Sequence, residues 1–277
     1  METKFNQPVP KKKRILLRPG WQDRLPIRPV LTAAAILALL TVMILINQPR
    51  SKVLNSAEME MVRNTGVLRI GVDESLYGLY ENGEGLETDI GFALGEAIFD
   101  DTDGVSFVPC TRYSAQWRMA DGYIDLALLS MQSFGSNTGY SHSAVPFYTD
   151  DCVLMGYAER PLAGTTVAVL AGTAAETVAY RYVDQKEPEM VVVPCADYYS
   201  MLVKLRAGAV DAMCMPRTAA LSHLEQRMVI FAEPIGTVSY YAIAPDGSVL
   251  LELCSELFTE WSGDGTFDAW KKARGLS

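Results

Sequence analysis

Residues 107–127 read FVPCTRYSAQWRMADGYIDLA, and residues 192–212 read VVPCADYYSMLVKLRAGAVDA. Both segments run from an apolar strand through Val-Pro-Cys, a Tyr/Ser pair and an amphipathic helix to a Gly turn, after which an Asp opens a further strand. This repeat predicts two α/β lobes built alike. Two such lobes that face one another form a cleft, and ligands of open parallel sheets bind beyond the carboxyl ends of the strands. The sequence therefore predicts a small-molecule site between lobes.

Alternating strand and helix patterns extend outward from the first copy. Residues 67–72 form a short apolar, β-branched run bounded by Gly and Asp, the pattern of a buried strand. Residues 89–99 place apolar side chains at helical spacing, while residues 105–108 and 123–129 have the pattern of two further strands. The order β-α-β-α-β predicts a parallel sheet with helices on its faces.

The composition is that of a globular protein, but its charge is unevenly distributed. The 277 residues are 49% hydrophobic and 21% charged, with a net charge of −9. Residues 1–28 hold eight Lys and Arg against two acidic side chains, so the rest of the chain is strongly acidic. An acidic body is repelled by phosphate backbones, which argues against nucleic acid as a partner.

An uncharged run, VLTAAAILALLTVMILI at residues 30–46, separates the basic tail from the acidic body. A helix over this run spans about 26 Å, close to the roughly 30 Å hydrocarbon core of a bilayer. A cleaved signal peptide and a buried core helix are the alternatives. The basic cluster at residues 11–14 favours a cytoplasmic N-terminus. We therefore expect a single-pass anchor over residues 29–47 in the cell membrane, with the C-terminal domain extracellular or periplasmic.

Residue types that bind metals or perform catalysis are sparse and scattered. Five Cys give no CxxC pair and permit at most two disulfides, and the two histidines, His142 and His223, lie far apart in the chain. The acidic run at residues 100–104 lacks the spacing and the closing Glu of a calcium loop. The sequence contains no recognisable Ser/His/Asp triad or nucleotide loop. We therefore expect no catalytic residues, no metal, no cofactor and no enzymatic activity.

Seven short motifs over about residues 60–275 occur in the order and spacing of a known family. They are GVLRIGV at 66–72, GLETDI at 85–90, GYIDL at 122–126, PFY at 146–148, LAGTTVAVLAGT at 162–173, GAVDA at 208–212 and DGTFDAW at 264–270. By these motifs the chain resembles the extracellular solute-binding proteins of family 3, the substrate-binding proteins of amino-acid ABC transporters, which have the type II periplasmic-binding fold.

The resemblance implies an α/β, two-lobed fold, here preceded by one transmembrane helix. The second lobe is inserted into the first, so that two crossing strands form a hinge. The expected division is a cytoplasmic basic tail at 1–28, the anchor at 29–47, a linker at 48–58, lobe 1 at 59–153 and 240–277, and lobe 2 at 154–239.

Loops at the carboxyl ends of the predicted strands supply the expected ligand-binding residues. Three loops of the first lobe contribute Asp73, Glu74, Tyr77, Tyr113, Ser130, Gln132 and Asn137. Two loops of the second lobe contribute Gly172, Thr173 and Arg217. These side chains include carboxylates, aromatic rings, amides and hydroxyls, which together suit a small polar ligand.

Gly172 and Thr173 fit two interpretations. Free N–H groups and the positive dipole at a helix N-terminus attract an anion such as a carboxylate. Thr173-Ala-Ala-Glu176 equally fits a capping box, in which Thr173 caps the helix and Glu176 reaches back. The two interpretations are compatible if the start of the helix faces the cleft.

The sequence departs from the family at both charged anchors of an amino acid. The family usually carries Thr-x-x-Arg after the third strand, whose Arg grips the ligand carboxylate; Phe134 and Asn137 stand at those positions. An Asp of the second lobe usually holds the ligand ammonium group, and Pro216 takes its place. Arg217 and an acidic residue of the first loop are the available substitutes.

We expect a membrane-anchored extracellular protein that captures a small polar solute, an amino acid or a related compound, for an ABC transporter permease. The missing anchors motivate an alternative, a ligand-sensing or accessory domain of the same fold without a transport role. A third interpretation is an enzyme of a related fold with Glu74 or Glu176 as general acid, which rests on analogy alone.

Overall fold

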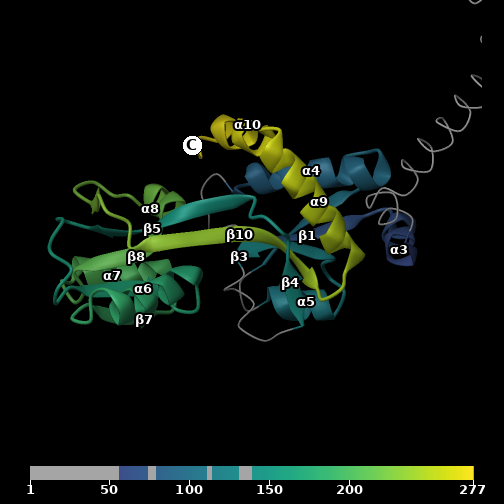
Figure 1. The fold of residues 1–277 in the computed structure, drawn as a ribbon. Helices are drawn as coiled ribbons and strands as arrows, with labels where there is room; N and C mark the ends of the chain where they lie inside the picture. The colour runs from purple at the N-terminus through teal and green to yellow at the C-terminus, as the bar shows by residue number, and fades with distance from the viewer. Residues whose placement is uncertain (1–55, 74–78, 111–113, 131–138, 277) are drawn as a thin grey trace, which may run out of the picture. The chain divides into compact units, whose positions relative to one another are not determined.

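The computed structural model describes residues 56–73, 79–110, 114–130 and 139–276 (Figure 1). The chain divides into two compact units, residues 1–48 and 49–277, and all described residues belong to the second. The predicted anchor at residues 29–47 lies outside the described residues. Within the described ranges, no helix is long and apolar enough to cross a membrane.

The first half of the sheet, as we call strands β1 to β3, is parallel throughout. β1 pairs with β2 on one side and with β3 on the other. The elements of this region are α3 (Ala57–Thr65), β1 (Leu68–Val72), α4 (Leu86–Phe99), β2 (Val105–Pro109), α5 (Ala115–Ala120), β3 (Leu126–Ser130) and β4 (Tyr140–His142). The β-α-β-α-β order predicted from the sequence is therefore present.

The second half of the sheet, strands β6 to β8, repeats this arrangement. β6 pairs in parallel with β7 and with β8. The elements of this region are β6 (Thr166–Leu170), α6 (Ala174–Gln185), β7 (Val191–Cys195), α7 (Tyr198–Arg206), β8 (Ala212–Pro216), α8 (Arg217–Ser222) and β9 (Val229–Ile230). In each half, the strand that comes first along the chain, β1 or β6, lies between the other two.

Two long antiparallel strands, β5 (Tyr148–Gly156) and β10 (Gly236–Pro245), connect the halves. β10 pairs with β3 and with β5, and β5 pairs in turn with β8. The resulting strand order is β2-β1-β3-β10-β5-β8-β6-β7. We call β5 and β10 the connecting strands. They correspond to the two crossing strands expected from the sequence.

Buried residues concentrate in the strands nearest the connecting pair. Every residue of β3 and of β8 is buried, whereas β2 and β7, at the ends of the strand order, are mostly half-buried or exposed. Strands covered on both faces are expected to be continuously apolar, as AMCMP is throughout and LALLS is up to its final Ser130.

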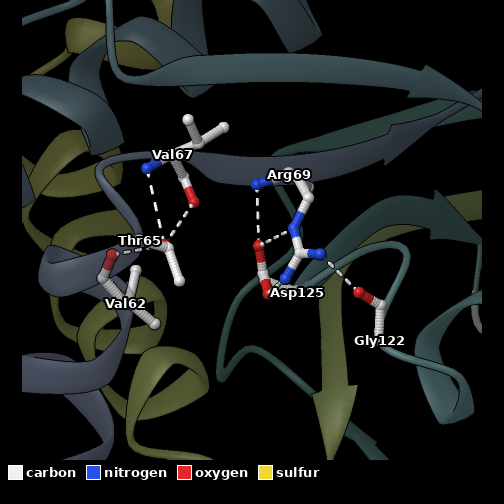
Figure 2. Close-up of polar contacts among 6 residues, drawn as sticks. All are labelled: Val62, Thr65, Val67, Arg69, Gly122 and Asp125. Carbon is white, nitrogen blue, oxygen red and sulfur yellow. Dashed lines mark hydrogen bonds and ion pairs between the residues drawn. The ribbon is translucent and has the colours of Figure 1, made fainter.

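The sequence repeat corresponds to a repeated polar contact at the amino ends of β3 and β8. The Asp125 carboxylate accepts hydrogen bonds from the backbone N–H of Arg69 at 2.8 Å and from its guanidinium at 2.6 Å, as Figure 2 shows. The Asp211 carboxylate accepts from the backbone N–H of Thr166 at 2.9 Å and from the Arg160 guanidinium at 2.5 Å. Each Asp thus fastens one strand to its parallel neighbour.

Two helices follow β10, α9 (Val249–Gly263) and α10 (Thr266–Ala273). The start of α9 is capped from a distant part of the chain. The carboxylate of Glu58, on α3, accepts hydrogen bonds from the Ser248 hydroxyl at 2.8 Å and from the Val249 N–H at 3.0 Å. α3 and the C-terminal helices are therefore joined.

Candidate functional site

Half of the ten ligand-binding residues expected from the sequence fall within the described residues. Those described are Asp73, Ser130, Gly172, Thr173 and Arg217. Those outside the described residues are Glu74, Tyr77, Tyr113, Gln132 and Asn137. The following geometry concerns the first group and its neighbours.

Asp73 and Ser130 lie at one edge of the first half of the sheet. Asp73 directly follows β1 and Ser130 ends β3, the parallel neighbour of β1. Ser130 is buried and stands opposite Tyr240 of β10, which in turn stands opposite Tyr148 of β5. The rings of Tyr240 and Tyr148 stack with centroids 6.0 Å apart. A polar row therefore runs from the carboxyl ends of the first half onto the connecting strands.

Three tyrosines near this edge share a negative environment. Burial raises the pKa of Tyr240, and the charges of Asp150 and Asp73 raise it further. Burial and the charge of Asp150 likewise raise the pKa of Tyr148, and burial and the charge of Asp73 raise that of Tyr198. All three phenols therefore stay protonated at physiological pH and can donate a hydrogen bond to a ligand.

Arg217 is already paired with a carboxylate. Its guanidinium lies 3.3 Å from the Asp151 carboxylate of β5. The adjacent Asp150 is buried and accepts hydrogen bonds from the Thr218 N–H at 2.9 Å and from the Thr218 hydroxyl at 2.8 Å. The start of α8 is thus fastened to a connecting strand. Since the Arg217–Asp151 pair is partly exposed, a ligand carboxylate can compete for the guanidinium.

The start of α6 carries its own anion. Thr173 caps the helix, because its hydroxyl oxygen accepts a hydrogen bond from the Glu176 N–H at 3.4 Å. The Glu176 carboxylate reaches back to accept a hydrogen bond from the N–H of Gly172, one residue earlier than in a standard capping box. The capping interpretation of Thr173 and Glu176 therefore holds. Glu176 occupies one of the donors that an anionic ligand would use.

Glu87, in the first turn of α4, is fully buried and was not singled out from the sequence. Neither of its carboxylate oxygens has a hydrogen-bond partner within the described ranges. Burial raises the pKa of Glu87 well above its ordinary value, and the charge of Asp73 raises it further. The nearby backbone N–H of Asp73 lowers the pKa by a smaller amount, although it lies outside hydrogen-bonding geometry. An acidic residue in a first helical turn usually faces solvent, so its burial leaves no trace in the sequence.

Two of the cavities lined by described residues are well enough formed to describe, and none of the ten expected residues lines either one. A cavity of about 350 Å³ lies among α7, β8 and α8, where the ring centroids of Tyr198 and His223 lie 4.5 Å apart with their planes tilted by 39°. Another, of about 470 Å³, lies beside Arg69 and Asp125. No group of three or more His, Cys, Asp or Glu side chains in the described ranges is arranged to hold a metal ion.

No protein-family model and no curated protein matches the sequence. Solved structures do match. The solute receptor for L-cysteine of Neisseria gonorrhoeae has a TM-score of 0.63 and 16% identity, over 78% of this chain and 92% of that one. A periplasmic binding protein of an ABC transporter from Brucella ovis, with glutathione bound, has a TM-score of 0.61 and 21% identity, over 73% and 69%.

A third similar structure is the ancestral amino acid-binding protein AncCDT-1, a precursor of cyclohexadienyl dehydratase. Its TM-score is 0.60 and its identity 18%, over 79% of this chain and 99% of that one. This chain has the mixed α/β fold of the periplasmic binding proteins. At these identities the similarity concerns the fold, and function has to be argued from the site.

Proposed function

We propose that this protein is a membrane-anchored extracellular solute-binding protein that captures a small polar solute, an amino acid or a related compound, and presents it to an ABC transporter permease. The observation that carries the proposal is the strand order. Among the described strands, the antiparallel pair β5 and β10 joins two parallel halves that otherwise share no strand pairing. Rotation about such a pair is the simplest way to open and close a ligand site.

The proposed lobes are residues 59–153 with 240–277, and residues 154–239. Asp73 and Ser130 belong to the first, Gly172, Thr173 and Arg217 to the second. Tyr240 and Tyr148 lie on the connecting strands, beside Ser130 in the pairing. We place the ligand where these groups meet when the lobes close, in contact with phenol and hydroxyl groups and with Asp73.

The test is a thermal-shift screen of the full chain, in a mild detergent, against amino acids, small peptides including glutathione, and organic acids. A ligand at 100 times its dissociation constant stabilises the folded state by about 2.7 kcal/mol. We therefore expect Tm to rise by roughly 5–10 °C with at least one class. Asp73→Asn should reduce the shift, and Asp184→Asn, which removes an exposed charge of α6, should preserve it. A panel without any shift would contradict solute capture.

The proposed location has a separate test. In sealed vesicles that carry the full chain with the cytoplasmic face inward, an added protease should digest the acidic body and leave the basic tail protected. Protection of the body would contradict the proposed orientation while leaving solute capture intact.

A sensing or accessory role is the second candidate, because Phe134, Asn137 and Pro216 replace the usual charged groups. Copurification distinguishes the two roles. A transport role predicts that the full chain, extracted with its native membrane, brings a permease with it in a ligand-dependent manner. Ligand binding without any permease would favour sensing.

A further inference from the structure

Two of the five cysteines face one another. The sulfur atoms of Cys152 and Cys214 lie 3.3 Å apart, although 62 positions separate the residues in the chain. Both side chains are fully buried. Cys110, Cys195 and Cys254 are buried thiols as well, but the described structure records no contact of their sulfur atoms with a second cysteine.

The strand register explains the contact. β5 and β8 are antiparallel, with Cys152 opposite Pro216 and Leu154 opposite Cys214. Opposite residues point to the same face and side chains alternate along a strand, so both thiols point to one face on a diagonal of the ladder. Bonded sulfur atoms lie about 2.05 Å apart, so closure requires an approach of roughly 1.3 Å. Diagonal neighbours in a sheet have Cα atoms about 7–8 Å apart, at the upper limit for a disulfide, so closure also draws β5 and β8 slightly together at this point.

Other chemistry fits this pair poorly. A structural zinc site needs four ligands, and the described residues offer no group of three or more that could hold a metal. A reactive cysteine needs a lowered pKa, whereas the hydrogen bond with Cys214 and burial raise the pKa of Cys152 well above its ordinary value. Once the protein is folded, Cys152 is therefore a poor nucleophile and the described residues form no metal site around the pair, which favours a cross-link made before the fold closes.

We propose that Cys152 and Cys214 form a disulfide that cross-links β5 to β8 when the chain folds in an oxidising compartment. The oxidant is itself a disulfide, either of a small thiol such as glutathione or of an oxidoreductase. One cysteine thiolate attacks the oxidant and expels one thiolate. The second cysteine then attacks the mixed disulfide and expels the other. The protein loses two protons and two electrons, and the oxidant becomes two thiols.

The cross-link closes the chain around almost the whole second half. The loop from Cys152 to Cys214 contains β6, α6, β7 and α7. The Cys214 sulfur also lies 3.8 Å from the backbone oxygen of Ala175, in the first turn of α6. Because both sulfurs are buried, exchange takes place before the second half packs, and the finished bond is shielded from reductants. A closed loop of this length reduces the freedom of the unfolded chain and so stabilises the fold.

The experiment unfolds the full chain in guanidinium chloride with dithiothreitol and refolds it, in a mild detergent, with either a glutathione redox buffer or dithiothreitol. Free thiols are alkylated after a second unfolding, and peptides are mapped without reduction. We expect the glutathione sample to contain a peptide pair joined through Cys152 and Cys214, lighter by two hydrogen atoms. Its Tm should exceed that of the dithiothreitol sample by roughly 5–10 °C.

Variants sharpen this test. Cys152→Ser and Cys214→Ser should each abolish the Tm difference between the two refolding conditions, whereas Cys195→Ser should retain it. The peptide map of the unmodified chain does not depend on any variant folding. The proposal is overturned if natively refolded protein from the glutathione buffer has both thiols alkylated, or if either cysteine is joined to a different one.

Discussion

The two halves of the sheet share a plan but differ at the starts of their helices. In both, an Asp at the amino end of a strand binds the backbone of the parallel neighbour and an Arg side chain. α6 begins with a side-chain cap from Thr173 and an acidic group, Glu176, that is hydrogen-bonded to the chain. α4 begins at Leu86, after Gly85, which provides no side-chain cap, and it buries Glu87 without a hydrogen-bond partner among the described residues.

The starts of α6 and α4 are therefore expected to contribute differently to the stability of the fold. A satisfied cap strengthens a helix, whereas a buried carboxylate without a hydrogen-bond partner destabilises the fold. Glu87, which has no hydrogen-bond partner among the described residues, lies beside Asp73, at the edge where the proposed ligand binds. Unfavourable groups of this kind are commonly retained at functional sites. Of the two helix starts, that of the first half is therefore expected to be the less stable.

The largest expected effect is on the free energy of unfolding when the glycine before α4 or the glycine before α6 is replaced by Ala. Gly85 has φ 137° and ψ −178°, a conformation open essentially to Gly alone, and an added Cβ would lie 2.2 Å from the Leu79 carbonyl oxygen. Gly85→Ala should lower the free energy of unfolding by roughly 3–5 kcal/mol. Gly172, at φ 71°, is left-handed, and Gly172→Ala should cost only about 1–2 kcal/mol. Urea unfolding of both variants measures this, and equal losses would contradict it.

The second prediction compares the two strand-fastening carboxylates. The Asp125 side chain is 18% exposed and that of Asp211 31% exposed. Asp125→Ala should cost about 2–3 kcal/mol, since the Asp125 carboxylate accepts two hydrogen bonds from a guanidinium and that of Asp211 accepts one. Asp211→Ala should cost about 1–2 kcal/mol. Chemical unfolding at neutral pH checks the order, and a larger loss for Asp211→Ala would refute it.

The third prediction concerns Glu87 and pH. Its pKa is raised in the folded state, so its contribution to stability is complete below the ordinary Glu value near 4.3 and is lost as pH rises through the folded pKa. Glu87→Gln removes the ionisation. The variant should match the unmodified chain near pH 4 and exceed its free energy of unfolding by about 1–2 kcal/mol at pH 8. Unfolding curves across this range measure the gap, and a constant gap would argue against a buried ionising group.

The smallest effect is expected for Glu→Gln at the start of α6, which should lower the free energy of unfolding, whereas Glu87→Gln should raise it. Glu176→Gln removes the charge that accepts the Gly172 N–H and faces the positive end of α6. We expect a loss of about 0.5–1 kcal/mol at pH 7. If Glu176→Gln stabilised the protein as Glu87→Gln is expected to, the two helix starts would not differ as described.

The strands and their parallel order were predictable, because the repeated apolar segments are local and separated by Gly turns. β3 nevertheless begins at Leu126, not at residue 123, since the turn at Gly122 and the bonds of Asp125 take up the intervening residues. Helix α4 begins at Leu86, before the predicted residue 89, because its first turn is packed inward.

The polar groups around the candidate site were less predictable. Tyr148 and Tyr240 meet only because β5 and β10 pair over a long sequence separation. Arg217 was expected as a ligand contact, and its pairing with Asp151 depends on the same non-local geometry. Periodicity fixes which face a residue takes within its own element, but it does not specify which distant element covers that face.

The hydrogen bonds between Glu58 and the start of α9 affect how a force on the N-terminal side of the chain is transmitted. A pull on the chain before residue 56 reaches α3 first and is passed through Glu58 to the C-terminal helices. It bypasses β6 to β8, which are connected to the rest of the sheet through β5. A force applied on this side of the chain would therefore load the first half before it reaches β6 to β8.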